Sequence, residues 1–526
     1  MNSKADQFID LRNAIKNRWN VLDWKLRFPW WGPPPKCRIL MYADGVVQFD
    51  GGAFQGLQYI NELLTSRAYF YVDFEVSFAN RDGSDPSATI PGAQKLTDLD
   101  IMNSYDQIWF FGYNGGASLQ PDEVALMDQF MGAPKFGGVL HTGDHADLGQ
   151  GLASQIARVG SMRLYPAPPN VPYTWNNTLV ERPPASGEPA DPLPPNNYFN
   201  FNDQSDDLPQ TIRWRQYPSG GNGLFRRSRP HPILCGPDGP IDVIPDHQHE
   251  GEALAPTPLA GDANWPTKSG NQEAPQVIAW GRIKDPTATK YGQEIGVLSA
   301  YDGHNVDVGR IVADSTWHHW FDINQLGLLG SGAPYQGFVA TPKGQAALKK
   351  IDAYHLNIGV WLAPPDLQAA MRRAAWWSII WSNPVVELPG DAPIWYYGQT
   401  AIDALGRRAS RCMVVTWVFN PPIYWPVIPW WEWIEYLQRF QIIELPVEQY
   451  LAGGILYELS HAVGVHGKNA RFPERAPTAS VLDKAIDAGV KRGLKALVLQ
   501  LKGEVAELKP LIDSGFDPQA MRARRP

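Results

Sequence analysis

The sequence predicts an α/β fold in which a mostly parallel β-sheet is flanked by helices. Short apolar segments alternate with segments whose apolar residues recur at helical spacing, which is typical of parallel strands joined by helical crossovers. Several apolar segments also break abruptly into glycine and polar residues, as strands do at the carboxyl edge of such a sheet. With 526 residues, the chain can bury a large core in two or three domains, or in one domain with insertions.

Residues 1–35 are expected to form a helical arm. Ile9, Ile15 and Trp19 lie close to helical spacing, and the sequence WWGPPP at 30–35 then ends the helix because three prolines cannot continue one. The charged residues are scattered, and the region lacks the apolar core of a signal peptide. Together with three well-separated cysteines and no CxxC motif, this pattern predicts a cytoplasmic protein with reduced thiols.

Residues 36–330 are expected to form the α/β domain. Strands are predicted at 37–44, 69–78, 107–116, 138–140, 276–283, 294–303 and 309–322, and helices at 54–64 and from residue 120. Pro121 in the first turn, followed by two acidic residues, suits the positive end of that second helix. At about 165–274 the alternation gives way to a long proline-rich insertion, which we expect to fold back over the edge of the sheet.

The remaining residues, 331–526, are expected to be mainly helical and rich in tryptophan. Helices are predicted at 344–362, 365–382 and 478–508. Residues 413–431 carry no charge, but four prolines argue against a transmembrane helix because each removes a hydrogen bond that lipid cannot replace. We expect the aromatic segment 413–433 or the last helix to form a core ridge or a homo-oligomer interface, with interfacial membrane contact as a further alternative.

The segment 136–149, FGGVLHTGDHADLG, is the predicted centre of the functional site. It combines a short buried strand with polar residues and Gly143, and a helix is expected to follow. Ligands of open α/β sheets bind in the crevice beyond the carboxyl ends of the strands, so we expect His141, Asp144 and His145 at that edge. Two further polar segments are expected to reach it, PDHQHEGE at 245–252 and STWHHWFD at 315–322.

These motifs resemble the class I glutamine amidotransferase-like fold, and within it the ThuA-like (trehalose utilisation) branch. The amidotransferase strand and turn carry a pattern such as GVCLGHQ with a nucleophilic cysteine, whereas this chain has VLHTGDH with His141 at the cysteine position. ThuA-like proteins likewise tend to carry Gly-x-His there, and the catalytic histidine of a late amidotransferase strand corresponds to His318 or His319. The resemblance covers about 37–329 without the insertion and implies a sugar-type substrate. Glutamine hydrolysis is rejected because an imidazole cannot simply replace the missing thiolate.

The distribution of histidines favours a divalent metal. Seven of the eleven fall in three polar clusters, namely His141, His145, His247, His249, His304, His318 and His319. Neutral imidazole and carboxylate oxygen suit Zn, Mn or Fe, and a metal-bound water would replace the missing nucleophile.

Each candidate residue has an expected role. The candidate metal ligands are His141, Asp144, His145, His247, His249 and His318. The candidate catalytic residues are His141, His318 and a general base, Glu250 or Glu252. The candidate substrate contacts are Asp44, Trp317 and Trp320, the two indoles being suited to stacking on a sugar ring. Neighbouring residues of an extended segment point to opposite faces, so only one of His318 and His319 is expected to face the crevice.

The predicted function is metal-assisted hydrolysis or isomerisation of a small polar, sugar-like molecule. A net charge of −8 without a basic run argues against a nucleic-acid partner. Simpler local explanations are that Asp144 only caps the following helix and that 245–252 is a solvated loop. For the whole chain, the alternatives are a non-catalytic scaffold and a metal-free isomerase that uses His141 as acid and base.

Overall fold

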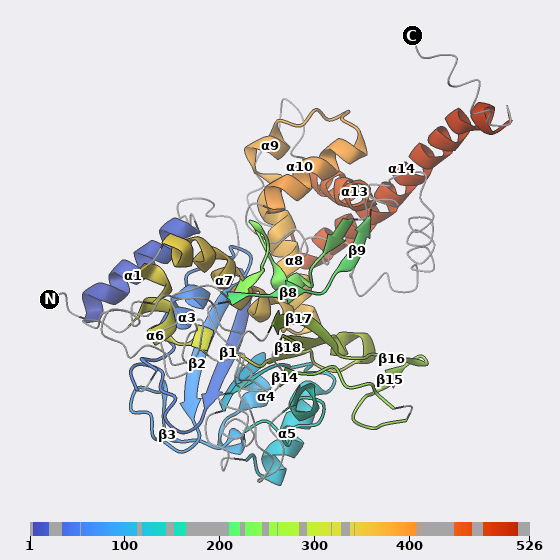
Figure 1. Cartoon of the computed structure of the whole chain (residues 1–526). Coiled ribbons are helices and arrows are strands. Elements are labelled where there is room, and N and C mark those ends of the chain that lie inside the picture. Colours follow the sequence, from blue (N-terminus) through green and yellow to red (C-terminus); the bar gives the residue numbers. More distant parts are fainter. Residues whose placement is uncertain are drawn as a thin grey trace.

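The structure is a computed structural model, and it describes residues 4–19, 34–52, 54–112, 118–143, 152–164, 210–220, 227–244, 252–259, 261–282, 292–316, 318–327, 337–340, 342–406, 409, 447–464 and 477–513. Within these residues the chain combines a large sheet, helices on both of its faces and a separate group of long helices near the carboxyl terminus (Figure 1). The predicted α/β class with a mostly parallel sheet is confirmed.

The described residues form a main sheet of nine strands in the order β3-β2-β1-β4-β5-β19-β18-β17-β8. Their bounds are β1 Lys36–Ala43, β2 Asp73–Asn80, β3 Ile90–Ala93, β4 Gln107–Gly112, β5 Gly138–Gly143, β8 Arg213–Trp214, β17 Gln276–Arg282, β18 Glu294–Tyr301 and β19 Ile311–Asp314. All neighbours from β3 to β19 are parallel, whereas β19, β18, β17 and β8 pair antiparallel. The short connection 302–310 explains the change of direction, because a parallel crossover needs a dozen or more residues.

Alternate residues of each strand supply two separate hydrophobic cores. Ile39 and Met41 of β1 pack in the core on one face, and Leu40 and Tyr42 pack in the core on the other. The first face carries α1 (Lys4–Arg18), α3 (Gln58–Thr65), α6 (Asp322–Leu326) and α7 (Pro342–Trp361), and the second carries α4 (Ile101–Ser104) and α5 (Pro121–Met131) (Figure 1). Helix α5 begins as predicted, with Pro121 in its first turn and a capping box formed by Gln120 and Glu123.

Described parts of the insertion pack onto this body through short elements. The edge strand β8 belongs to the insertion, β14 pairs with β6 and contacts β18, and η4 and β11 contact α7. The short strands are β6 Arg163–Leu164, β7 Gln210–Thr211, β9 Tyr217–Gly220, β10 Arg227–Arg229, β11 Cys235–Gly236, β12 Gly239–Pro240, β13 Val243–Ile244, β14 Glu252–Ala253, β15 Thr267–Lys268 and β16 Asn271–Gln272. The 3₁₀ turns are η1 Leu96–Asp98, η2 Gly160–Met162, η4 Pro232–Leu234, η5 Gly303–Val306, η6 His318–Trp320 and η7 Phe338–Ala340.

After α7, the described chain contains five helices, α8 Pro365–Ile380, α9 Asn383–Val386, α10 Ile394–Gly406, α13 Val447–Ala462 and α14 Ala479–Asp513. Helix α13 packs between α10 and α14, and the last turns of α14 extend beyond the other helices (Figure 1). The aromatic segment 413–433 lies outside the described residues. Among the helices that the structure describes, none is both long and apolar enough to cross a bilayer.

Glycines allow the close crossing of α13 and α14. A Cβ atom on Gly454 would lie 2.0 Å from the carbonyl oxygen of Gly489, and one on Gly489 would lie 2.3 Å from the Cα of Ile455. We therefore expect Gly454→Ala to destabilise the protein by about 1–3 kcal/mol in urea unfolding, because the helices must separate.

Gly503→Ala is the matched control within α14, because its Cβ would meet no atom within 4 Å. This change should stabilise the helix by up to about 1 kcal/mol through helix propensity. Equal effects of the two substitutions would contradict the packing explanation.

Candidate active site

The strand order reverses at β1, which has β2 on one side and β4 on the other. Connections leave such a switch point in opposite directions and open a crevice at the carboxyl ends of the strands. Asp44, the residue directly after β1, is fully buried there, and its backbone N–H donates to the carbonyl of Phe111 in β4 at 3.4 Å. The predicted substrate contact Asp44 thus lies where the topology places a ligand site.

The loop after β1 is held by side chains from the last residue of β2 and from the segment that follows it. The carboxylate of Asp82 accepts the backbone N–H of Gly45 at 3.1 Å, and the carboxylate of Asp85 accepts that of Phe49 at 2.8 Å. The Asn80 amide donates to the carbonyl of Val47 at 3.3 Å. These bonds fix the loop that carries Asp44.

His141 lies two strands away, in β5 between β4 and β19. Its side chain is 1 % exposed, on the face of the sheet that carries α5. Burial, and next the nearby Arg163 cation, lower the pKa of His141 to about 3, while a hydrogen bond to the Val159 backbone opposes this shift. The imidazole is therefore neutral at pH 7, with one ring nitrogen bonded to Val159.

A second polar cluster lies at the end of β19 on the opposite face. The Asp314 carboxylate contacts His319 Nε2 at 2.8 Å, and it accepts hydrogen bonds from the Tyr354 hydroxyl at 2.6 Å and from the Thr316 hydroxyl at 2.6 Å. The Thr316 hydroxyl also contacts His319 Nδ1 at 2.8 Å. All four side chains are fully buried.

The hydrogen count of this cluster favours an ion pair. The three contacts among Asp314, Thr316 and His319 need three hydrogens, whereas the hydroxyl and a neutral imidazole supply only two. The third comes either from a protonated Asp314 carboxyl or from a doubly protonated His319 beside an ionised Asp314, and the lowered pKa of Asp314 selects the second. Burial alone raises the pKa of Asp314, but His319 and the hydrogen bonds from Thr316 and Tyr354 outweigh burial and lower it.

His355 of α7 packs against His319 and Trp320. Its ring centroid lies 5.8 Å from that of His319 and 4.8 Å from that of Trp320. Neither ring nitrogen of His355 has a hydrogen-bond partner within the described structure. Burial, and next the charge of His319, lower the pKa of His355 well below its usual value. Nothing in the local sequence connects α7 to the end of β19, so His355 could not be placed at this cluster from the sequence alone.

The structure separates two groups that the sequence placed together. Ala313 pairs with His141, so Asp314 and its partner His319 fall on the other face of the sheet from His141. Residues 318–320 form the turn η6 rather than an extended segment, so the expected strand-like alternation of His318 and His319 was wrong.

Trp320 is fully buried against Trp109 and Phe111. This placement leaves no exposed indole face on which a sugar could stack.

Glu252, the candidate general base that the structure describes, is half-buried in β14 opposite Leu164. Outside the described residues lie Asp144, His145, His247, His249, Glu250, Trp317 and the side chain of His318. Among the side chains that the structure describes, no three His, Cys, Asp or Glu residues are arranged to hold a metal.

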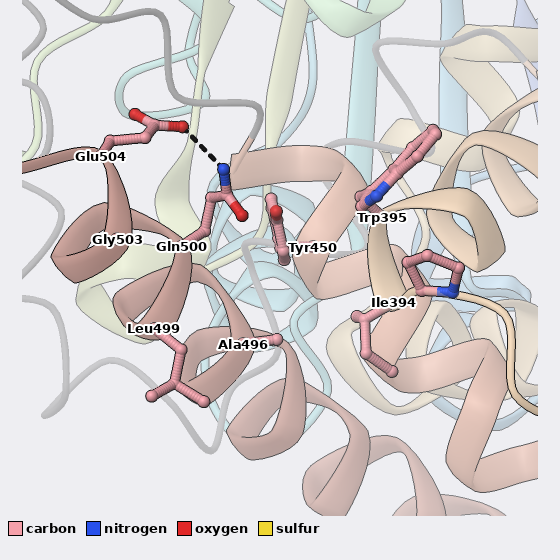
Figure 2. A pocket seen from close by; sticks show the side chains of 9 residues that line it. Ile394, Trp395, Tyr450, Ala496, Leu499, Gln500, Gly503 and Glu504 are labelled. Carbon is pink, nitrogen blue, oxygen red and sulfur yellow. Dashed lines mark hydrogen bonds between the residues drawn. The ribbon is translucent and has the colours of Figure 1, made fainter. Parts of the chain in front are cut away.

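A groove of about 450 Å³ lies elsewhere, between α10, α13 and α14 (Figure 2). Trp395, Tyr450 and Leu499 line it, and the Gln500 amide donates to Glu504 at 2.9 Å. The groove contains none of the residues that the sequence singled out. We therefore place the candidate chemistry at the sheet edge rather than in this groove.

The neutral, buried state of His141 predicts a specific pH dependence. The folded pKa of about 3 lies below the unfolded value near 6.5, so the unfolded state binds the extra proton as the pH falls. Stability from this group is complete above pH 6.5 and decreases by up to about 1.4 kcal/mol per pH unit below it. His141→Gln should therefore flatten the fall in unfolding free energy between pH 6.5 and 4.

His461→Gln is the control for this measurement because His461 is exposed. Urea unfolding at several pH values should give the control the same slope as the original protein. Parallel curves for His141→Gln and the original protein would contradict the prediction.

The candidate site thus combines a buried carboxylate at the switch point with a neutral histidine two strands away, and a charged Asp–His pair lies on the opposite face. Comparison with known proteins found no matching protein-family model, no matching curated protein and no matching solved structure. The geometry and chemistry of these residues therefore carry the functional argument.

Proposed function

We propose that the protein is an enzyme with a class I glutamine amidotransferase-like fold, of the ThuA-like branch. It acts on a small polar, sugar-like substrate by hydrolysis or isomerisation, with the assistance of a divalent Zn, Mn or Fe ion. The observation that carries this proposal is the fully buried Asp44 carboxylate at the switch point, on the same carboxyl edge of the sheet as β5, which leads into the HTGDH motif.

His141 fits the requirements of a metal ligand. Metal-bound histidines are neutral and usually hold one ring nitrogen in a hydrogen bond to a carbonyl or carboxylate, which leaves the other nitrogen for the metal. The low pKa of His141 and its bond to the Val159 backbone meet both conditions. The Arg163 cation opposes a second cation, so the carboxylate of Asp144, three residues after His141 in the sequence, is needed to balance the charge. When bound, the metal would lower the pKa of a coordinated water.

The other candidates have roles that do not depend on the identity of the metal. Asp44 accepts hydrogen bonds from substrate hydroxyl groups, and the rigid loop around it fixes their orientation. Glu250 or Glu252 serves as general base, and His145, His247, His249 and His318 complete the candidate ligand set. The Asp314–His319 pair braces the end of β19 from the opposite face.

Metal titration of the full-length chain tests this proposal. After dialysis against chelator, we expect stoichiometric rebinding of Zn, Mn or Fe(II) in elemental analysis, with a rise in melting temperature, because a ligand that binds only the folded state stabilises it. Asp144→Asn and His145→Ala should each abolish stoichiometric binding. His461→Ala, an exposed histidine far along the chain, is the control.

The alternatives give different results. No stoichiometric metal and no change in melting temperature would favour the non-catalytic scaffold. A metal-free isomerase would convert sugars after chelation but lose activity in His141→Ala.

We also propose a homo-oligomer formed through the carboxyl-terminal helices, where Trp395 and Leu499 are 46 % and 59 % exposed. Light scattering of Leu499→Glu should then show a smaller particle.

A further inference from the structure

Arg158 is a buried cation for which the described structure contains no ion pair. The residue comes after β5 in the sequence and is only 8 % exposed. Its Nη1 donates to the carbonyl of Asn264 at 2.8 Å, whereas its Nε has no hydrogen-bond partner within the described structure. Burial lowers the pKa of Arg158, and Asp128, the carboxylate that acts against this shift, is exposed to solvent. A buried charge of this kind is costly unless an opposite charge accompanies it.

The hydroxyl of Tyr301 is a second donor nearby, because the Tyr301 ring contacts Trp265 and Arg158 bonds to the carbonyl of the preceding residue, Asn264. Tyr301, the last residue of β18, is fully buried, and its hydroxyl also has no partner within the described structure. Burial raises the pKa of Tyr301 to about 12, against the opposing effect of the nearby Arg158 cation. The Tyr301 ring packs edge-on against Trp265, with 5.1 Å between the ring centroids. This contact restricts the positions that the Tyr301 hydroxyl can reach.

The backbone also holds Arg158 in place. Its φ of 64° lies in the left-handed region that residues with side chains rarely adopt. The Ser161 hydroxyl donates to the Arg158 carbonyl at 2.7 Å and secures this turn. Arg158 and Tyr301 are thus fixed donors from segments far apart in the sequence.

We propose that Arg158 and Tyr301 form a buried binding site for an oxyanion, either a carboxylate or a phosphate group. Such a group accepts from the Arg158 Nε–H and the Tyr301 hydroxyl together, and it supplies the missing negative charge. A water molecule could satisfy the two donors but would leave the guanidinium charge uncompensated. The site does not depend on the proposed metal or on the proposed reaction.

The test measures anion binding by the full-length protein. The protein is dialysed into a buffer without oxyanions, and its melting temperature and binding heat are followed during titration with inorganic phosphate. Acetate and succinate form the carboxylate arm, and sodium chloride at matched ionic strength is the reference. We expect a saturable effect of phosphate or of a carboxylate, and no saturable effect of chloride.

Two variants assign that effect to the site. Arg158→Gln should remove saturable binding, yet without oxyanion it should unfold at the same temperature as the original protein or higher, because a buried charge has been removed. Tyr301→Phe should weaken binding about tenfold with little change in the anion-free melting temperature, since it removes one hydrogen bond. Arg213→Gln, which alters an exposed ion pair with Glu294, is the control and should bind normally.

Two results would overturn the proposal. One is an equal response of Arg158→Gln, Tyr301→Phe and the original protein, which would indicate an adventitious ion only. The other is no saturable response to any oxyanion, which would indicate that water alone satisfies these donors. If Arg158→Gln fails to fold, Tyr301→Phe decides the question by itself.

Discussion

Replacing Asp314 by alanine is expected to lower the free energy of unfolding by about 3–5 kcal/mol. The substitution removes the acceptor of the Tyr354 and Thr316 hydroxyls and the counter-charge of His319, all of which are fully buried. Removing one partner of a buried ion pair costs far more free energy than replacing both partners with apolar residues. The remaining charge stays buried without a counter-charge.

Urea unfolding at pH 7 measures this effect. Tyr354→Phe, which removes one hydrogen bond and keeps the ring, should cost only about 1–2 kcal/mol. Asp307→Asn removes the charge of an exposed pair with Lys268 and suits the left-handed φ of 60° at this position, so it should cost less than about 1 kcal/mol. A loss for Asp314→Ala no larger than that for Tyr354→Phe would show that Asp314 and His319 are not an ion pair.

The pH dependence of this difference has a defined sign. The pKa of Asp314 is lowered in the folded protein, so its contribution is complete above the unfolded value near 3.9 and is lost as the pH falls through the folded pKa. The gap between the unfolding free energies of Asp314→Ala and the original protein should therefore narrow as the pH falls below about 4.

Local sequence patterns predicted the elements of the fold well because those patterns have local causes. The continuous apolar run 108–111 in β4 predicts a buried strand. Pro121 and Glu123 specify the start of α5. Strand direction has no such local signature. The antiparallel pairing of β17, β18 and β19 follows from their connections and their place in the sheet.

The predicted convergence of histidines does not extend to His319, because it required the register of two strands. The side chain of His318, the candidate ligand, lies outside the described residues. Asp314 follows directly after Ala313, the partner of His141, and a shift of one residue moves a side chain to the other face. A local signal for the Asp314–His319 pair did exist. The Thr316 N–H donates to the Asp314 carboxylate, and this turn returns the following histidines toward the aspartate.

The remaining partners of that pair could not be found from the sequence. Tyr354 and His355 come from α7, and only the packing of α7 on the sheet brings them to Asp314 and His319. Arg158 and Tyr301 present the same difficulty, because each is ordinary in its own segment and unusual only when the burial of both is known.

Asp352→Ala is expected to release the amino-terminal helix and to cost about 3–5 kcal/mol. Asp352 of α7 is fully buried, and its carboxylate accepts from Arg18 and Trp19 at the end of α1 and from the Tyr59 hydroxyl of α3. Burial alone lowers the pKa of Arg18, but Asp352 and Tyr59 outweigh burial and raise it. One carboxylate thus joins three helices on the same face of the sheet.

The experiment separates local detachment of α1 from general destabilisation. Limited trypsin digestion should cut Asp352→Ala after Arg12 and Arg18 well before the rest of the chain, whereas the original protein resists at these sites. Glu294→Gln is the control, because its exposed pair with Arg213 does not involve α1 and should contribute less than about 1 kcal/mol. Unchanged cleavage in Asp352→Ala would mean that apolar contacts such as Ile15 hold α1 by themselves, since the buried carboxylate would then be dispensable for docking.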